Sequence, residues 1–202
     1  MERAVKAHYP EAVVTSIPVA DGGEGSVDAF LTALGGERRH AVVHGPYGEE
    51  MESFYGVVNG KTAIIEMAAC AGLPLVGDRL DPSLTTTYGV GELMLDAARR
   101  GAEHIIVALG GSATNDGGCG AAAACGIGFY DASGRQFVPT GSTLKDVARI
   151  DLTSRSPRLE GITITVMCDI DNPFWGPTGA AHIFGPQKGA DREMVALLDE
   201  GM

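Results

Sequence analysis

The chain has 202 residues, of which 45% are hydrophobic, so it can bury the core of one sizeable domain or two small ones. Its formal net charge of -11 gives it no broad cationic surface, which argues against a nucleic acid or an anionic membrane as partner. An anionic substrate would need local positive potential from helix N-termini and a few fixed Lys or Arg side chains.

The apolar residues fall in short runs broken by 29 glycines and 10 prolines, which favours an α/β protein built from many short elements. The sequence has no recognisable signal peptide, and its apolar runs are all shorter than a bilayer-crossing helix needs. We therefore predict a cytoplasmic protein without a membrane partner. The oligomeric state is left open.

The first elements in chain order are a helix, a strand and a second helix. Residues 1–9 have a helical apolar face with no capping residue before it, as at the end of a longer helix. Residues 12–19 are rich in β-branched side chains and predict a strand. An Asp-Gly-Gly-Glu-Gly loop at 21–25 then leads into an amphipathic helix over 26–34, which completes a predicted α/β unit.

Antiparallel strands are predicted next, over residues 40–44, 51–58 and 61–67, where apolar residues alternate or cluster. Asn59 and Gly60 stand between the last two of these segments. An Asn-Gly pair in that position is a strong signal for a two-residue hairpin.

The middle of the chain predicts a helix, a strand and a second glycine-rich loop. Threonines 85–87 precede an apolar-periodic run and predict a threonine-capped helix within 84–101. Residues 105–109 form a continuous apolar run, which is typical of a strand buried on both faces. The loop at 110–120 follows, and an alanine-rich helix is expected over 121–125.

The last third begins with a turn-rich stretch at 131–157, which we interpret as a domain junction with one short helical piece near 144–147. A buried strand is predicted over 162–167. Asp191 is a good N-cap for a final helix that extends to Met202 and presents an apolar face in need of a partner.

The loop at 110–120 is the most informative local motif. A strand-to-helix turn this rich in glycine aims several backbone N–H groups at one small volume, which suits phosphate oxygens. A tight turn that only closes the strand onto its helix explains the glycines equally well. A Walker A loop is excluded because no lysine lies between Lys61 and Lys145, and a dinucleotide fingerprint fits poorly.

Acidic residues follow three of the predicted strands: Asp21, Asp116, and Asp169 together with Asp171. Ligands collect at the carboxyl ends of parallel strands, so these side chains could converge in one crevice. In phosphoryl transfer such groups hold Mg²⁺ or orient the attacking hydroxyl, although a helix cap or turn is the ordinary role for any one of them. Lys188, in a loop bounded by Gly and Pro, is either a fixed cation or a solvated lysine.

Six blocks of the chain resemble the bacterial glycerate kinase family, in order and in spacing. They are residues 18–25, 65–69, 86–93, 110–118, 168–169 and 184–190, and the resemblance that they define extends along essentially the whole chain. The resemblance implies transfer of the ATP γ-phosphate to a hydroxyl of D-glycerate, with Mg²⁺ as the metal. Two alternatives remain open: an NAD(P)-binding oxidoreductase domain and a non-catalytic fragment.

The resemblance also implies a Rossmann-like parallel-sheet domain with a second α/β domain inserted into it, and an active site in the cleft between them. We place residues 1–67 in the first domain and 68–202 in the second. Segments that family members carry before and after these blocks are missing. The sequence therefore predicts a chain cut short at both ends, with little or no activity by itself.

Within that activity we predict residue roles. Phosphate contacts are expected from Gly110, Gly111, Ser112, Thr114 and Asn115. Asp169 is the expected base or metal ligand, Asp116 a second metal ligand, and Lys188 the cation that stabilises the transferring phosphoryl group. Asp21, Glu24, Thr86 and Thr87 are the expected substrate-side groups, the two threonines facing the glycerate carboxylate.

Overall fold

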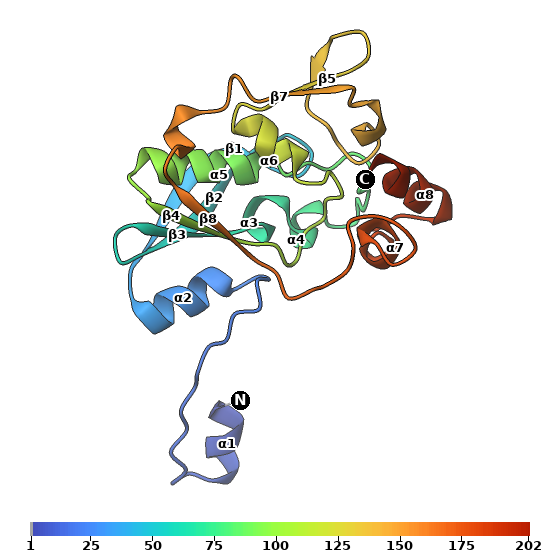
Figure 1. Ribbon diagram of the computed structural model, residues 1–202. Coiled ribbons are helices and arrows are strands. Elements are labelled where there is room, and N and C mark those ends of the chain that lie inside the picture. Colours follow the sequence, from blue (N-terminus) through green and yellow to red (C-terminus); the bar gives the residue numbers. More distant parts are fainter. Residues whose placement is uncertain (1) are drawn as a thin grey trace.

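The computed structural model describes residues 2–202, a mixed α/β structure (Figure 1) that confirms the predicted class. Met1, the first residue of the predicted helix over 1–9, lies outside the described residues. The helices are α1 Glu2–His8, α2 Ser26–Leu34, α3 Ala68–Ala71, α4 Leu73–Val76, α5 Tyr88–Arg99, α6 Cys119–Ala124, α7 Ala180–Phe184 and α8 Arg192–Gly201, with 3₁₀ turns η1 Leu144–Asp146, η2 Pro157–Leu159 and η3 Pro186–Lys188. The strands are β1 Glu37–His44, β2 Glu50–Val58, β3 Thr62–Glu66, β4 His104–Ala108, β5 Gly128–Tyr130, β6 Gln136–Phe137, β7 Arg149–Asp151 and β8 Thr163–Met167.

The main sheet has the strand order β1-β2-β3-β4-β8. The strands β1, β2 and β3 pair antiparallel, as predicted, whereas β3, β4 and β8 run parallel. Asn59 (φ 52°) and Gly60 (φ 70°) join β2 to β3 with the two positive φ angles of a type I′ turn, so the predicted hairpin is confirmed. A small second sheet has the order β6-β5-β7.

Helices cover both faces of the main sheet, with α5 on one side and α2 on the other (Figure 1). Successive side chains of a strand point to opposite faces, and β3 shows the consequence. Ile65 packs in the larger core with Leu93 of α5, while Ile64 packs with Val27 of α2. Both isoleucines have no exposed surface, and each such burial stabilises the fold by about 1.5–3 kcal/mol.

The helices α5 and α6 approach closely at Gly91. A Cβ at this position would lie 2.3 Å from the carbonyl oxygen of Ala121 and 2.7 Å from the Cβ of Ala124. Only glycine leaves enough space for this contact. The contact packs α6, and the loop that precedes it, directly against α5.

The C-terminal helices α7 and α8 pack on one another through a small apolar cluster that includes Ala181 and Leu198. Asp191 caps α8 as predicted, because its carboxylate accepts a hydrogen bond from the backbone N–H of Met194 at 2.9 Å. Within residues 2–202, every helix is too short or too polar to pass through a bilayer.

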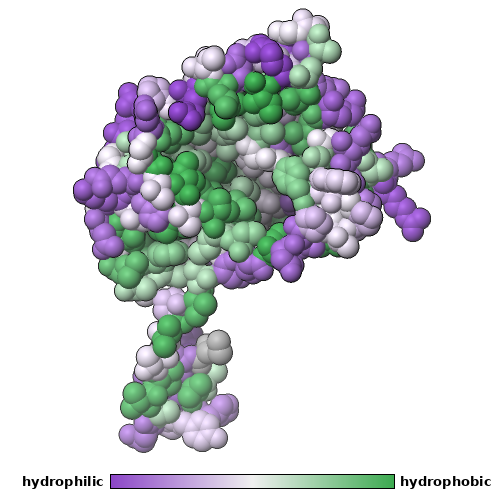
Figure 2. All heavy atoms as spheres, in the orientation of Figure 1, coloured by the Kyte–Doolittle hydropathy of each residue, from purple (hydrophilic) through white to green (hydrophobic). Residues whose placement is uncertain are grey.

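The prediction of a strand over residues 12–19 is wrong: the structure has an extended, unpaired segment there. Val13 is 96% exposed and Val19 86% exposed, and apolar side chains stand out from the narrow extension in Figure 2. β-branched residues favour strand formation, but a strand also needs a neighbouring strand to pair with its backbone N–H and C=O groups. Within the described residues this segment has none.

The strand predicted over 162–167 exists as β8, but it lies at the edge of the sheet and is not buried. Ile164 and Val166 keep about half of their surface exposed. The parallel pairing of β3 with β4 also means that one sheet continues through the predicted boundary between residues 1–67 and 68–202. The division into two domains stays a prediction.

Substitution of Gly91 by Ala tests the contact between α5 and α6. Helix propensity alone would make this change stabilising by about 1 kcal/mol. Because the new methyl group would overlap α6, we expect a loss of about 1–3 kcal/mol in the free energy of unfolding, measured by urea titration. Ala98→Gly, elsewhere in α5, is the control and should cost about 1 kcal/mol through propensity. A Gly91→Ala protein more stable than wild type would contradict the close contact.

Candidate functional site

The glycine-rich loop that follows β4 is fixed by backbone hydrogen bonds to two other loops. Gly110 N–H donates to the carbonyl of Gly22 at 2.7 Å, and Ala113 N–H donates to the carbonyl of Ala71 at 2.8 Å. A Cβ at Gly110 would lie 2.7 Å from Gly23, so the two glycine loops touch through their backbones. The predicted phosphate contact at Gly110 therefore cannot come from its N–H, which is already used.

This loop forms one wall of a cavity of about 320 Å³, whose other wall includes the end of β8, α7 and η3. Many of the predicted site residues line it together: Thr87, Gly110, Gly111, Ser112, Thr114, Asn115, Asp116, Asp169 and Lys188. Asp21, Glu24 and Thr86 are not among its lining residues. The tertiary structure thus brings together side chains from positions 87 to 188 of the sequence.

Lys188 is buried at the wall of this cavity, with 8% of its surface exposed. Its Nζ donates to Ser112 Oγ at 3.1 Å and to the carbonyl of Thr114 at 2.5 Å. An ammonium group has three donors, so one remains for a ligand. Burial lowers the pKa of Lys188 to about 8, and the negative charge of Asp116 acts in the opposite direction.

Asn115 supplies a second donor without a partner. It is 5% exposed, and its Nδ2 donates to no protein acceptor within residues 2–202. The backbone N–H groups of residues 114–117 also make no hydrogen bond within that range. Thr114, Asn115 and Asp116 are buried, whereas Gly117 is exposed. Buried donors left unsatisfied are costly, so the group at 114–116 beside a lysine is an arrangement suited to an anionic oxygen.

Asp116 is the most deeply buried charged residue of the site, at 1% exposed. Its Oδ2 accepts hydrogen bonds from Thr87 N–H at 2.7 Å, Thr87 Oγ1 at 2.8 Å and Gly120 N–H at 3.1 Å. Its Oδ1 accepts one from Gly118 N–H at 3.1 Å. Burial raises the pKa of this carboxyl group, and the four donors counteract the rise.

Of the threonines predicted to cap α5, Thr87 precedes the helix but does not cap it with its side chain. The Thr87 hydroxyl donates to Asp116 and accepts a hydrogen bond from Ala121 N–H at 2.9 Å. Thr86 Oγ1 accepts one from Tyr88 N–H at 3.2 Å. The polar atoms of Thr87 are therefore engaged within the protein.

The loop at 21–25 sits against the glycine-rich loop without lining the cavity. Asp21 is exposed and accepts a hydrogen bond from Gly23 N–H at 2.9 Å. The Glu24 carboxylate lies against Gly111, where a Cβ would be 2.5 Å from one of its oxygens. This proximity places Glu24 beside the wall of the cavity.

Glu66 is a residue that sequence reasoning missed as a structural anchor. It ends β3, is 3% exposed, and accepts a hydrogen bond from Val27 N–H at 2.5 Å. It thereby holds the start of α2, and with it the loop at 21–25. Its pKa is raised by burial. The only sequence signal was a single acidic residue directly after an apolar strand.

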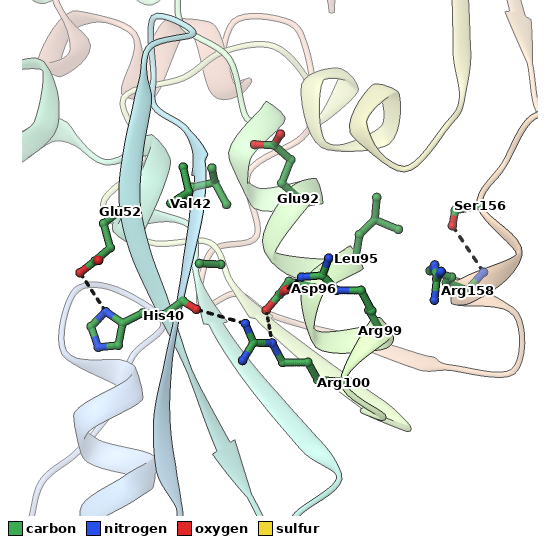
Figure 3. Close-up of a pocket in the computed structure, with 12 residues that line it drawn as sticks. His40, Val42, Glu52, Glu92, Leu95, Asp96, Arg99, Arg100, Ser156 and Arg158 are labelled. Atoms are coloured by element: carbon green, nitrogen blue, oxygen red, sulfur yellow. Dashed lines mark hydrogen bonds and ion pairs between the residues drawn. The ribbon is translucent and has the colours of Figure 1, made fainter.

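A larger hollow of about 720 Å³ lies elsewhere, between β1 and the C-terminal half of α5 (Figure 3). Its charged groups are largely paired: Asp96 bonds to both Arg99 and Arg100, and His40 lies 3.3 Å from Glu52. None of the predicted site residues lines it. We therefore place the functional site at the smaller cavity.

Comparison with known proteins shows the family of the chain. The sequence model named "Glycerate kinase family" matches residues 1–202. The chain belongs to the glycerate kinase family. Five of the six blocks that resemble the family, all except 18–25, contribute residues to the cavity lining.

Relatives within the family are similar over the whole of this chain. The "Glycerate 2-kinase" of Escherichia coli K12 and the "Glycerate kinase" of Bacillus subtilis 168 are each 46% identical to it. Those alignments cover 100% of this chain and 54% and 53% of the two relatives. The chain thus spans about half the length of the curated relatives it matches.

A solved structure shares the fold. The glycerate kinase 2 structure from Salmonella typhimurium LT2 superposes with a TM-score of 0.87 at 43% sequence identity. The match covers 99% of this chain and 54% of that one.

Sulfate is a suitable probe of the cavity because its charge is constant around neutral pH. We expect it to bind, and its affinity to fall as the pH rises through about 8, since Lys188 loses its proton there. Isothermal titration calorimetry of the 202-residue chain with sulfate, below and above this pH, measures the change in affinity. Lys188→Met should bind weakly at both pH values, while Lys145→Met, at an exposed lysine, should behave as wild type. A pH profile unchanged in Lys188→Met would contradict this role of the lysine.

Proposed function

We propose that the protein transfers the γ-phosphoryl group of ATP to a hydroxyl of D-glycerate and so forms a phosphoglycerate. The observation that carries the proposal is the cluster of unpaired donors at Asn115 and residues 114–117 beside the buried Lys188, in a chain of the glycerate kinase family. The names of relatives that are 46% identical support the substrate. A cytoplasmic location is proposed with it, because the reaction consumes ATP.

In this proposal the phosphoryl oxygens lie against Lys188, Asn115 and the free N–H groups of residues 114–117. The distribution of negative charge over these oxygens changes in the transition state of phosphoryl transfer. Hydrogen-bond donors that are already held in place stabilise that charge without having to reorient during the reaction. The fixed position of Lys188 supports the role, since its Nζ is held by Ser112 and Thr114 with one donor to spare. Gly111 keeps its proposed place beside the phosphates as part of the same wall.

Asp169 is the proposed acidic group of the reaction. It follows β8, lines the cavity and is exposed, and its carboxylate makes no hydrogen bond within residues 2–202. Mg²⁺ in kinases commonly takes one or two carboxylates together with phosphates and water, so Asp169 fits as a ligand. When bound, the ion would neutralise phosphate charge. Within the described part of the chain, no three His, Cys, Asp or Glu side chains converge to form a protein-only metal site.

Glycerate itself is proposed to bind on the side of the cavity nearest the loop at 21–25. Glu24 lies against Gly111, and Asp21 is exposed in the same loop, so their carboxylates can accept hydrogen bonds from sugar-acid hydroxyls. Thr86 and Thr87 stay predictions as carboxylate contacts. The full hydrogen bonding of Thr87 argues against direct contact by that residue.

The test is an ADP-release assay with D-glycerate, on the protein as its gene encodes it and on the 202-residue chain. We expect glycerate-dependent ADP formation by the former, and a kcat lower by about 10²–10³-fold in Lys188→Met because a preorganised donor is lost. Lys145→Met serves as the matched control and should retain the wild-type rate.

Three outcomes would argue against the proposal. Binding of NADH without any response to ATP would favour an oxidoreductase domain. A cooperative unfolding transition unaffected by Mg-ATP or glycerate in the gene-encoded protein would favour a non-catalytic one. Full activity of Lys188→Met would remove the lysine from the mechanism.

A further inference from the structure

We infer that Asp116 is a positioning residue of this site and not a ligand of Mg²⁺. The inference rests on the proposed function for the reaction it assists, but its geometric basis is independent of the substrate. The carboxylate ties the residue before α5 to the glycine-rich loop and to the start of α6. The glycine-rich loop carries the unpaired donors of residues 114–117.

The hydrogen bonds of Asp116 use most of the acceptor capacity of its two oxygens. Oδ2 accepts three hydrogen bonds, two from Thr87 and one from Gly120, and Oδ1 accepts one from Gly118. A carboxylate has about four lone-pair sites. A metal ion on Oδ2 would have to displace one of its three donors, and a displaced buried N–H is left unsatisfied. Oδ1 keeps one acceptor site beside its bond to Gly118.

The surroundings of Asp116 leave little room for a different arrangement. A Cβ at Gly120 would lie 2.2 Å from Thr86 Oγ1 and 2.7 Å from Asp116 Oδ2, so the backbone of α6 is packed directly onto the carboxylate. Thr87 Oγ1 also accepts from Ala121 N–H, which links the two helix starts a second time. Asp116 therefore lies at the wall of the cavity and is held there by protein donors from the start of α5, the glycine-rich loop and the start of α6.

The consequence for the reaction is geometric. The free N–H groups of residues 114–117 and the amide of Asn115 belong to the same loop as Asp116. If the carboxylate no longer holds that loop on α5, these donors lose their fixed aim at the phosphoryl group. Misplacement of catalytic groups by about 1 Å costs on the order of 10²-fold in rate.

Asp116→Asn keeps the shape of the side chain and replaces one acceptor by a donor that faces N–H groups. In the gene-encoded protein we expect kcat to fall by about 10²-fold, with little change in the KM for glycerate and no change in the half-saturating Mg²⁺ concentration. A metal ligand would give the opposite result: the half-saturating Mg²⁺ concentration would rise, and excess Mg²⁺ would restore the rate. That outcome would overturn the inference.

Thr87→Val supplies a second variant that leaves the carboxylate intact. If Asp116 is a positioning residue, losing the Thr87 hydroxyl should also lower kcat, by less than Asp116→Asn does, again with unchanged Mg²⁺ dependence. Wild-type kcat in Thr87→Val would contradict the network, and a selective rise in the KM for glycerate would instead make Thr87 a substrate contact. This variant also carries the test should Asp116→Asn fail to fold, as judged by near-UV circular dichroism.

Asp151→Asn is the matched control, because Asp151 accepts hydrogen bonds from Thr153 N–H at 2.9 Å and Thr153 Oγ1 at 2.6 Å, outside the cavity. Its kinetic constants should equal those of wild type.

Amide hydrogen exchange separates this inference from the proposed function. The amides of Thr87 and Gly120 should lose protection in Asp116→Asn even if the protein does not phosphorylate glycerate. Unchanged protection of both amides would overturn the inference by itself.

Discussion

A buried carboxylate that accepts four hydrogen bonds is the interaction on which the site depends. Asp116 has almost no contact with solvent, and its negative charge is stabilised by N–H and hydroxyl groups from two separate parts of the chain. Removing a carboxylate from water is costly unless its oxygens are fully satisfied. The start of α5, the glycine-rich loop and the start of α6 must therefore keep their relative positions. Glu66 does the same for α2 through Val27, so a buried acid holds each of the two glycine loops.

The opposite situation exists on the other side of the same loop, where donors lack acceptors. Asn115 and the N–H groups of residues 114–117 are held beside Lys188 without a protein partner. The protein thus satisfies its own anion at Asp116 and leaves cationic and N–H groups for an external one. In the proposed function, this division reconciles a net charge of -11 with an anionic substrate: the attractive potential is confined to a few fixed groups. Membership of the glycerate kinase family is consistent with a phosphoryl group in that place.

Some of the exposed apolar surface lies away from the site. It includes the unpaired segment around Val13 and Val19 and the free edge at Ile164 and Val166 of β8. The curated relatives are about twice as long as the part that this chain matches. The cavity, in contrast, is built from elements that the described residues contain, with β4 and α5 packed in the larger core and α8 packed on α7.

Local sequence determined the elements whose formation depends on neighbouring residues. The Asn59-Gly60 hairpin, the helix over 26–34 and the Asp191 cap follow from φ angles, periodicity and a side chain within reach of its own helix. The family blocks likewise identified most of the residues that line the cavity. Tertiary structure alone decided what depends on distant partners. The segment 12–19 has strand composition but no neighbouring strand, β8 is an edge strand despite its apolar run, and Thr87 bonds to Asp116 instead of capping α5. Each outcome depends on where another part of the chain lies, and a residue pattern read in one window does not contain that information.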